Sequence, residues 1–195
     1  MKGAVRRGNR RTDNKMTKAK KTASIQNMAM TAVMTAVLAV LAQVAIPLPT
    51  GVPITMQTFA VALIGAVLGV KNGLISYGVY ILLGVVGVPV FANLKSGISV
   101  LLGVTGGFLF GFALLVLFSA IGSNKKMAGA IFFGALGLFC TYALGCLQFA
   151  FLMKTSIVQA IVQVCLPYLV KDIISVIVAF IAGRIIRGLL QKIRR

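Results

Sequence analysis

The placement of charge along the chain constrains its fold more than any other feature. Between residues 23 and 183 the chain carries charged side chains at only seven positions, whereas basic residues gather at both ends. Hydrophobic residues make up 59% of the chain and charged residues 11%, whereas soluble domains are about half apolar and about a quarter charged. A chain with such long apolar stretches is expected to be an integral membrane protein.

The basic ends predict the orientation of the chain in the membrane. Of the twenty Lys and Arg residues, nine lie in residues 2–21 and five in residues 184–195. Cytoplasmic segments carry an excess of Lys and Arg, so both termini are predicted to be cytoplasmic. The length allows about six spans of roughly 20 residues. The predicted fold class is therefore an all-α integral membrane protein with six transmembrane helices. A nucleic-acid partner is not expected, because no folded basic surface is indicated.

Breaks in the apolar pattern predict the domain organisation. Residues 1–22 form a basic cytoplasmic tail, residues 23–190 a six-helix membrane domain in the lipid bilayer, and residues 191–195 a basic cytoplasmic end. The predicted helices cover residues 24–46, 56–70, 74–88, 98–122, 127–151 and 167–190. Residues 71–73 are read as a tight turn, and residues 156–166 as a short interfacial segment before Pro167.

One acidic residue stands out within the membrane domain. Asp172 begins the last apolar run beside Lys171, and the only other acid, Asp13, lies in the basic tail. An ionisable side chain in a membrane segment is costly and usually functional, although Asp172 can also simply pair with Lys171 or cap a helix near the surface. The predicted topology places it on the external side, with the uncharged loop 47–58 and loop 91–97. We therefore expect one outward-facing, mostly apolar pocket for a small ligand.

Other residues set limits on function. The chain has no histidine, and its three cysteines lie in apolar segments without paired metal-ligand spacing. No metal, cofactor or catalytic residue is expected, and the chain is not expected to be an enzyme. Ala32 and Ala36 have the spacing that lets another helix approach closely in lipid. That spacing fits docking of a partner helix and packing within the chain equally well.

Four motifs in order resemble the BioY family, the biotin-specific S-components of energy-coupling factor (ECF) transporters. They are Pro-x-Pro-Thr-Gly-Val-Pro-Ile-Thr-x-Gln-Thr at 47–58, Gly-Val-Pro-Val-Phe-Ala-Asn at 87–93, Gly-x-Thr-Gly-Gly-Phe-Leu-x-Gly-Phe at 103–112 and Leu-Pro-x-x-x-Lys-Asp at 166–172. The resemblance implies the S-component fold in the plasma membrane of a prokaryote. It also implies a substrate-capture subunit that works with a transmembrane coupling subunit and, through it, two ATP-binding subunits.

The resemblance also implies roles for individual residues. Asn93 and Asp172 would hydrogen-bond the ureido head of biotin, and a carboxylate can accept from its N–H groups. Thr55 and Gln57 match the loop that covers the site. The remaining roles are a close ligand approach at Gly106 and Gly107 and a surface for the coupling subunit at Ala32 and Ala36.

The sequence departs from the family pattern at three positions. The family commonly has Pro where Val104 stands, Tyr where Phe108 stands and Lys where Ser175 stands. The cation that meets the ligand carboxylate is therefore left open between Lys171, Lys95 and none. Two alternative functions also stay open: an S-component for thiamine or riboflavin, and a membrane protein without transport activity, such as a scaffold.

Overall fold

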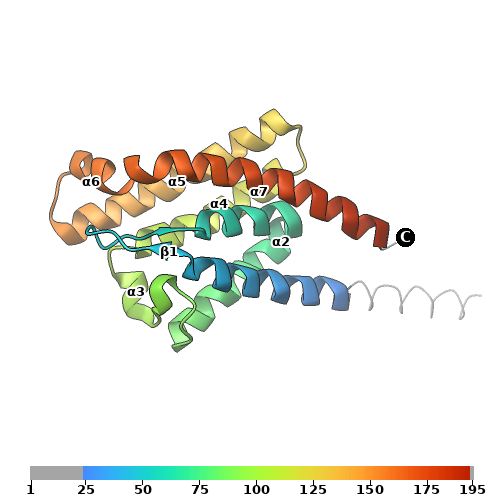
Figure 1. The fold of residues 1–195 in the computed structure, drawn as a ribbon, viewed down its shortest axis with the longest axis horizontal. Coiled ribbons are helices and arrows are strands. Elements are labelled where there is room, and N and C mark those ends of the chain that lie inside the picture. The colour runs from blue at the N-terminus through green and yellow to red at the C-terminus, as the bar shows by residue number, and fades with distance from the viewer. Residues whose placement is uncertain (1–23, 194–195) are drawn as a thin grey trace, which may run out of the picture.

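The structure is a computed structural model that describes residues 24–193, so the basic tail predicted for residues 1–22 lies outside the described residues. Most of the described chain is helical (Figure 1). In chain order, the elements are a first helix Ser24–Gln43, β1 Ala45–Ile46, β2 Ile54–Thr55, α2 Gln57–Val86, the 3-10 helix η1 Ala92–Leu94, α3 Ile98–Leu102, α4 Gly106–Gly122, α5 Met127–Met153, α6 Ile157–Val164 and α7 Leu166–Ile193.

Four of the described helices are long and apolar enough to cross a membrane: the first helix, α2, α5 and α7. Helix α4 is apolar but shorter, with 17 residues. Large apolar side chains also cover the outside, and Phe132, Phe139 and Phe151 are each at least 65% exposed. An outer surface of this kind suits lipid, because large exposed apolar patches are rare on soluble monomers. The structure thus confirms a mostly helical, apolar protein.

Helix α2 is two helical segments separated at Gly69. This glycine has φ 75° and ψ −174°, outside the helical region, and glycine reaches such a conformation without the steric cost that other residues carry. A Cβ on Gly73 would lie 3.6 Å from the Cα of Gly65, so the second segment folds back along the first. The prediction of two helices with a break here was right, but the break lies at Gly69 and not in residues 71–73.

A short β-hairpin occupies the segment predicted as a loop. The first helix ends at Gln43 and not at residue 46, because Ala45 and Ile46 pair with Thr55 and Ile54 in an antiparallel ladder. Pro47 disfavours helical geometry at the residue before it. The ladder hydrogen bonds then satisfy backbone groups that the broken helix leaves unpaired. The fold is therefore mostly but not wholly α-helical.

The predicted helix 98–122 is also broken. It forms α3 and α4 with an irregular turn between them, and the Gln148 side-chain amide of α5 donates to the carbonyls of Leu101 (2.9 Å) and Gly103 (2.7 Å). Helix α4 then packs tightly on α5: a Cβ on Gly107 would lie 2.2 Å from the carbonyl oxygen of Leu144. Small residues allow this close approach of two helices in lipid.

The two ends of the molecule differ (Figure 1). The hairpin, α3 and α6 gather at one end, whereas the first helix begins and α7 finishes at the other. Helix α6, with a capping box between Ser156 and Gln159, agrees with the predicted short segment 156–166. Helix α7 then begins at Leu166 with Pro167 in its first turn, where the missing N–H of proline costs nothing.

Candidate binding site

A pocket opens at the end of the molecule that holds the hairpin and α6. The empty space between its lining residues, including the part that is open at the mouth, is about 700 Å³. The hairpin and the start of α2, the segment 91–95, α4, α5, and the start of α7 all contribute to its lining. The polar breaks that the sequence places on one side therefore do meet around a common space, as predicted.

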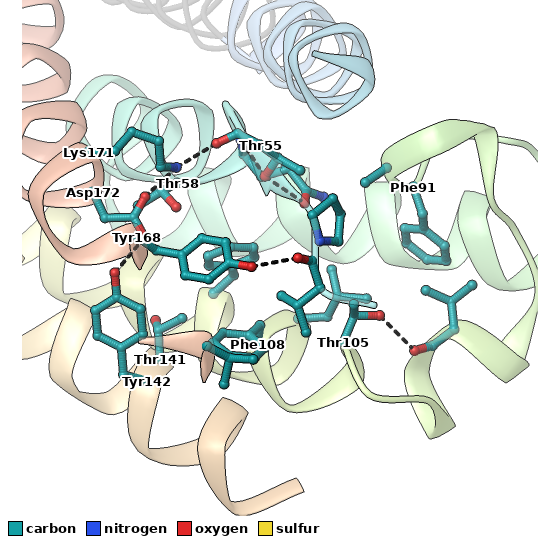
Figure 2. Close-up of a pocket in the computed structure, with 18 of the residues that line it drawn as sticks. Thr55, Thr58, Phe91, Thr105, Phe108, Thr141, Tyr142, Tyr168, Lys171 and Asp172 are labelled. Atoms are coloured by element: carbon teal, nitrogen blue, oxygen red, sulfur yellow. Dashed lines mark hydrogen bonds and ion pairs between the residues drawn. The ribbon is translucent and has the colours of Figure 1, made fainter. Parts of the chain in front are cut away.

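Asp172 forms the most polar corner of the pocket (Figure 2). It is only 5% exposed. Its Oδ2 accepts a hydrogen bond from the Tyr142 hydroxyl at 2.6 Å, and its Oδ1 forms an ion pair with the ammonium of Lys171. Among the described residues, no donor makes a hydrogen bond of good geometry to Oδ1. A buried carboxylate oxygen of this kind can still accept from a ligand.

Lys171 is held from two sides. Its Nζ donates to the backbone carbonyl of Thr55 in β2 at 2.6 Å, in addition to its ion pair with Asp172. The pairing of Asp172 with Lys171, one of the two simpler readings of the sequence, is thus present. It occurs inside the pocket wall, so it does not remove Asp172 from the site. The ammonium neutralises the carboxylate and links α7 to the hairpin.

Tyr168 makes a second link between α7 and the hairpin loop. It precedes Asp172 by four residues and so lies on the same face of the helix. Its hydroxyl donates to the carbonyl of Val52 at 2.5 Å, and the residue is 5% exposed. The first turns of α7 therefore present Tyr168 and Asp172 to the pocket while both are tied to neighbouring segments.

A chain of hydrogen bonds fixes the start of α2. The Thr55 hydroxyl donates to Gln57 Oε1 at 3.2 Å, Gln57 Nε2 donates to the Tyr80 hydroxyl at 2.7 Å, and that hydroxyl donates to the Val90 carbonyl at 3.1 Å. Thr55, Gln57 and Tyr80 are all buried. A fully connected network of this kind holds its members in one arrangement.

The segment 90–95 forms another edge of the pocket. Gln43, at the end of the first helix, donates through Nε2 to the carbonyls of Val90 (3.0 Å) and Phe91 (3.2 Å) and accepts from the Leu94 N–H (3.0 Å). The ring of Phe91 fills the space beside Gly84 and meets Tyr80 edge-on, with centroids 5.5 Å apart. Hydrogen bonds and ring packing therefore hold the segment 90–95 against the helix bundle.

Aromatic and aliphatic side chains form the rest of the lining. Phe108, Leu109 and Phe112 come from α4, and Phe108 meets Tyr142 edge-on with centroids 6.5 Å apart. Helix α5 adds the Thr141 side chain, whose hydroxyl is already bonded to the Gly137 carbonyl. The pocket is therefore mostly apolar with a few polar groups, an arrangement that suits a small, semi-polar ligand.

The structure brings some predicted site residues together and leaves others apart. Thr55, Gln57, Lys171 and Asp172 all line the pocket. Asn93 does not line it; it is exposed and adopts a left-handed conformation with φ 58°, although its neighbours Ala92 and Lys95 are lining residues.

The two glycines of the 103–112 motif also lie away from the pocket lining. A Cβ on Gly106 would lie 1.7 Å from the carbonyl oxygen of Leu101, and Gly107 faces α5 in the same way. The structure therefore gives both glycines a packing role. The sequence interpretation, in which they admit a ligand close to the helix, stays a prediction.

Ala32 and Ala36 are both exposed on the first helix. The same helix exposes Val33 (56%) and Val40 (67%), whereas Met34 and Leu38 are buried against the bundle. The two alanines therefore belong to the outward surface of the helix and do not pack within the described chain. Docking of a partner helix at these two alanines stays a prediction.

Sequence reasoning missed several residues of the site. Tyr142 comes from the interior of α5, where no local pattern marks it as ligand-facing, and Phe108 was noted only as a departure from the family motif. Tyr168 did carry a signal, because its spacing of four residues from Asp172 puts both on one helix face. Within residues 24–193 there is no group of three His, Cys, Asp or Glu side chains able to hold a metal ion.

The fold and the pocket together define a class of protein: a small, mostly helical chain with four described helices long and apolar enough to cross a membrane, and with a pocket at one end of the bundle. The fold is that of a crystal structure described as the S-component for biotin from an ECF-type ABC transporter. The TM-score is 0.79, the match covers 86% of this chain and 93% of that chain, and the sequences are 23% identical. The sequence profile of the BioY family matches residues 14–192. The chain belongs to the BioY family.

Relatives from bacteria and archaea agree with this assignment. The biotin transporter BioY of Thermotoga maritima is 41% identical over 149 residues, covering 75% of this chain and 87% of that protein. A probable biotin transporter BioY of Pyrococcus horikoshii is 34% identical, covering 70% and 82%. Biotin transporter BioY2 of Lactococcus lactis is 32% identical, covering 82% and 88%. The resemblance seen in the four motifs is confirmed.

Proposed function

We propose that this chain is the substrate-capture subunit of a membrane vitamin importer and that it binds biotin in the pocket at the head of α7. Membership of the BioY family and the biotin transporters among its relatives support this proposal. The role is one of binding and delivery, and no catalytic step is assigned to the chain.

One observation carries the assignment of the site. Asp172 is buried in the pocket wall, and its Oδ1 pairs with the Lys171 ammonium but accepts no further hydrogen bond from the described residues. An ionised carboxylate oxygen has more than one acceptor site, so Oδ1 can accept from a ligand N–H as well as from the ammonium. The ureido group of biotin offers two adjacent N–H donors and one carbonyl, so it complements a carboxylate that stands beside a hydroxyl and an ammonium.

The rest of the proposed binding mode follows from the lining. The ureido head lies at Asp172, with Tyr142 and Lys171 beside it. The thiophane ring and the aliphatic tail lie against Phe108, Leu109 and Phe112, which are apolar lining residues. Thr55 and Gln57 order the hairpin edge that covers the ligand. Asn93 reaches the ureido head only through a rearrangement of the segment 91–95, because its side chain is exposed in this structure.

We further propose a multi-pass arrangement in the prokaryotic plasma membrane. Counting the two segments of α2 separately, the first helix, α4, α5 and α7 complete six spans. The beginning of the first helix and the end of α7 lie at one end of the bundle (Figure 1). Since basic residues gather in 2–21 and 184–195, that end faces the cytoplasm, and the pocket faces outward.

Partners follow from the same proposal. Ala32 and Ala36 form an exposed small-residue strip on the first helix, where the transmembrane coupling subunit of the importer docks. Two ATP-binding subunits then act through that coupling subunit.

The partner interaction has its own test. Bulky substitutions, Ala32→Trp and Ala36→Trp, are expected to abolish biotin uptake with the coupling subunits co-expressed while biotin binding to the isolated chain stays within about twofold, since the pocket is untouched. The matched control is Phe139→Trp on α5, at a side chain that is already large and exposed on another helix. Equal loss of uptake in all three variants would count against this docking surface.

Asp172→Asn tests the binding site. It keeps the size of the side chain but removes the charge, and it leaves Lys171 without its counter-ion. Biotin affinity measured by titration calorimetry is expected to fall about 100-fold, which corresponds to about 2.7 kcal/mol. The control is Ser175→Ala, a buried position about one turn along α7 that does not line the pocket. Unchanged biotin affinity in Asp172→Asn would overturn the site.

A ligand screen separates biotin from other vitamins. A tight ligand raises the apparent melting temperature of the chain in detergent, by an amount that grows with the ratio of the ligand concentration to its Kd. Biotin is expected to produce the shift, and thiamine and riboflavin are not. A shift with thiamine or riboflavin and none with biotin would replace biotin as the ligand while keeping the S-component assignment.

A further inference from the structure

Two of the three cysteines face each other near the end of the bundle that holds the pocket. Cys146 belongs to α5, and Cys165 lies at the corner where α6 ends and α7 begins. Their sulfur atoms are 2.6 Å apart, although the residues are 19 positions apart in the sequence. The fold therefore brings the two thiols together from separate helices.

The contact between the two sulfurs is closer than ordinary packing. Unbonded carbon atoms in contact lie about 3.5–4.0 Å apart, and sulfur is larger than carbon. A buried cysteine often serves only as a small hydrophobic side chain, but that role does not require its sulfur to meet a second one. Cys146 and Cys165 are only 4% and 8% exposed, so the two thiols meet inside the core.

The cysteine pair also lies close to the ligand pocket. Cys146 follows Tyr142 by four residues, and Cys165 precedes Tyr168 by three, so each shares a helix face with a lining residue of the pocket. Tyr142 in turn donates to Asp172 of α7 at 2.6 Å. A bond between the sulfurs would fasten α5 to the corner of α6 and α7 about one helical turn from this contact.

The proposed orientation puts both sulfurs toward the external side. Helix α5 ends at Met153, seven residues or about 10 Å beyond Cys146. Disulfides form and persist outside the cell and are rare in the cytoplasm. The third cysteine, Cys140, lies deeper in α5, is half-buried, and has no sulfur contact within residues 24–193. Only one pair of cysteines is thus placed for a disulfide.

We propose that Cys146 and Cys165 form a disulfide bond in the membrane-embedded protein, and that this bond fastens the corner of α6 and α7 to α5. The inference rests on the proposed outward orientation of the pocket and does not depend on which vitamin the pocket binds. Once formed, the bond is shielded from external reductants because both residues are buried.

The bond requires an oxidant, and an external disulfide, RSSR, supplies it. One cysteine thiolate attacks RSSR, whose S–S bond breaks, and a mixed disulfide and one RSH result. The second thiolate then attacks the mixed disulfide, closes the bond between Cys146 and Cys165, and releases the second RSH. The two thiol protons and two electrons end on the two RSH molecules. The exchange precedes the final packing of the corner, because both thiols are buried in the folded chain.

The linkage can be read from peptides, because Lys154 is the only Lys or Arg between the two cysteines. Membranes from cells that express the full chain are quenched in acid, free thiols are blocked with N-ethylmaleimide, and the chain is digested with trypsin without a reductant. Trypsin separates residues 127–154 from residues 155–171, so only a disulfide keeps these peptides joined. We expect mass spectrometry to find them mostly joined, and to find them separate after dithiothreitol.

Serine variants identify the bonded cysteines, since Cys140 and Cys146 lie on the same tryptic peptide. Cys140→Ser is the matched control and should keep the two peptides joined. Cys146→Ser and Cys165→Ser should each leave them separate. A disulfide that closes a loop of this length should also raise the melting temperature of the wild-type chain by about 5 °C over the chain treated with dithiothreitol. Cys146→Ser should show no such difference.

Three outcomes would overturn the proposal. Separate peptides from wild-type membranes, with Cys146 and Cys165 both alkylated, would show that the thiols stay reduced. Joined peptides in Cys146→Ser would show that Cys140 forms the bond. A melting temperature that dithiothreitol leaves unchanged in the wild type would show that no bond holds the corner. Failure to bind biotin is a separate result, which overturns the proposed function and leaves the peptides joined.

Discussion

The wall of the pocket formed by α4 and α5 differs from the wall formed by the hairpin and α7 in what holds it together. Helices α4 and α5 meet backbone to backbone, since a Cβ on Gly111 would lie 2.5 Å from the Cα of Thr141. The hairpin and α7 meet through side chains: Lys171 donates to the Thr55 carbonyl and Tyr168 to the Val52 carbonyl. Close helix packing therefore holds the first wall together, whereas a few side-chain hydrogen bonds hold the second.

The difference separates stability from binding. Close-packed helices cannot shift without losing many van der Waals contacts at once, whereas a single hydrogen bond contributes about 1 kcal/mol net. Asp172, the residue proposed to hold the ligand head, belongs to the wall with polar bonds. The effects of substitutions in the two walls should therefore differ. Those in the wall of α4 and α5 should mainly lower stability, whereas those in the wall of the hairpin and α7 should mainly weaken ligand binding.

The largest effect is expected from a side chain placed into the packed wall. In Gly107→Val, the new Cβ would lie 2.2 Å from the carbonyl oxygen of Leu144, and the helices must separate to admit it. We expect a loss of about 3 kcal/mol of stability, measured as a lower melting temperature by circular dichroism in detergent. Gly78→Ala is the matched control, because nothing lies within 4 Å of that Cβ. Comparable losses in both variants would contradict the packing role.

A smaller effect is expected where the two walls meet. Tyr142 of α5 donates to Asp172 Oδ2 of α7 at 2.6 Å, and Tyr142→Phe removes this donor from a buried carboxylate. Loss of a donor to such a group costs about 1–3 kcal/mol. Biotin binding is expected to weaken about tenfold by calorimetry, with little change in far-ultraviolet circular dichroism. Binding at the wild-type level would mean that Asp172 is positioned by Lys171 alone.

The smallest effect is expected from one polar bond of the second wall. Tyr168→Phe removes the hydrogen bond to the Val52 carbonyl but keeps the ring, so stability should fall by only about 1 kcal/mol. The hairpin loop loses a tie to α7, and the dissociation rate of biotin should rise. Stopped-flow displacement of labelled biotin measures that rate. A dissociation rate equal to that of the wild type would show that this bond does not restrain the loop.

The sequence predicted the helical segments well because charge and apolar runs are local signals. The division of the chain at Lys125 and Lys126 and the start of the last helix near Pro167 both agree with the structure. The hairpin at Ala45 and Ile46 was missed, because two paired residues on each strand carry no period-2 pattern. The break at Gly69 was placed a few residues late, since Asn72 and Gly73 have the stronger turn composition.

The site was only partly predictable for a different reason. Asp172 was found because a carboxylate in an apolar run is chemically conspicuous. Tyr142 and Phe108 reach the pocket only through the packing of α4 on α5, which depends on the glycines between them. The position of Asn93 depends on its left-handed backbone. Asparagine tolerates this conformation, but an asparagine in the sequence does not predict it. Long-range contacts of this kind cannot be predicted from any short stretch of sequence.

Gln43 gives the first helix a mechanical connection to the rim of the pocket. Its side chain makes three hydrogen bonds to the backbone of residues 90, 91 and 94, and it stands at the end of the helix that exposes Ala32 and Ala36. A helix is stiff along its axis, so any displacement of the first helix would carry Gln43 with it. The segment 90–94 would then have to move with the helix, or the three hydrogen bonds from Gln43 would break.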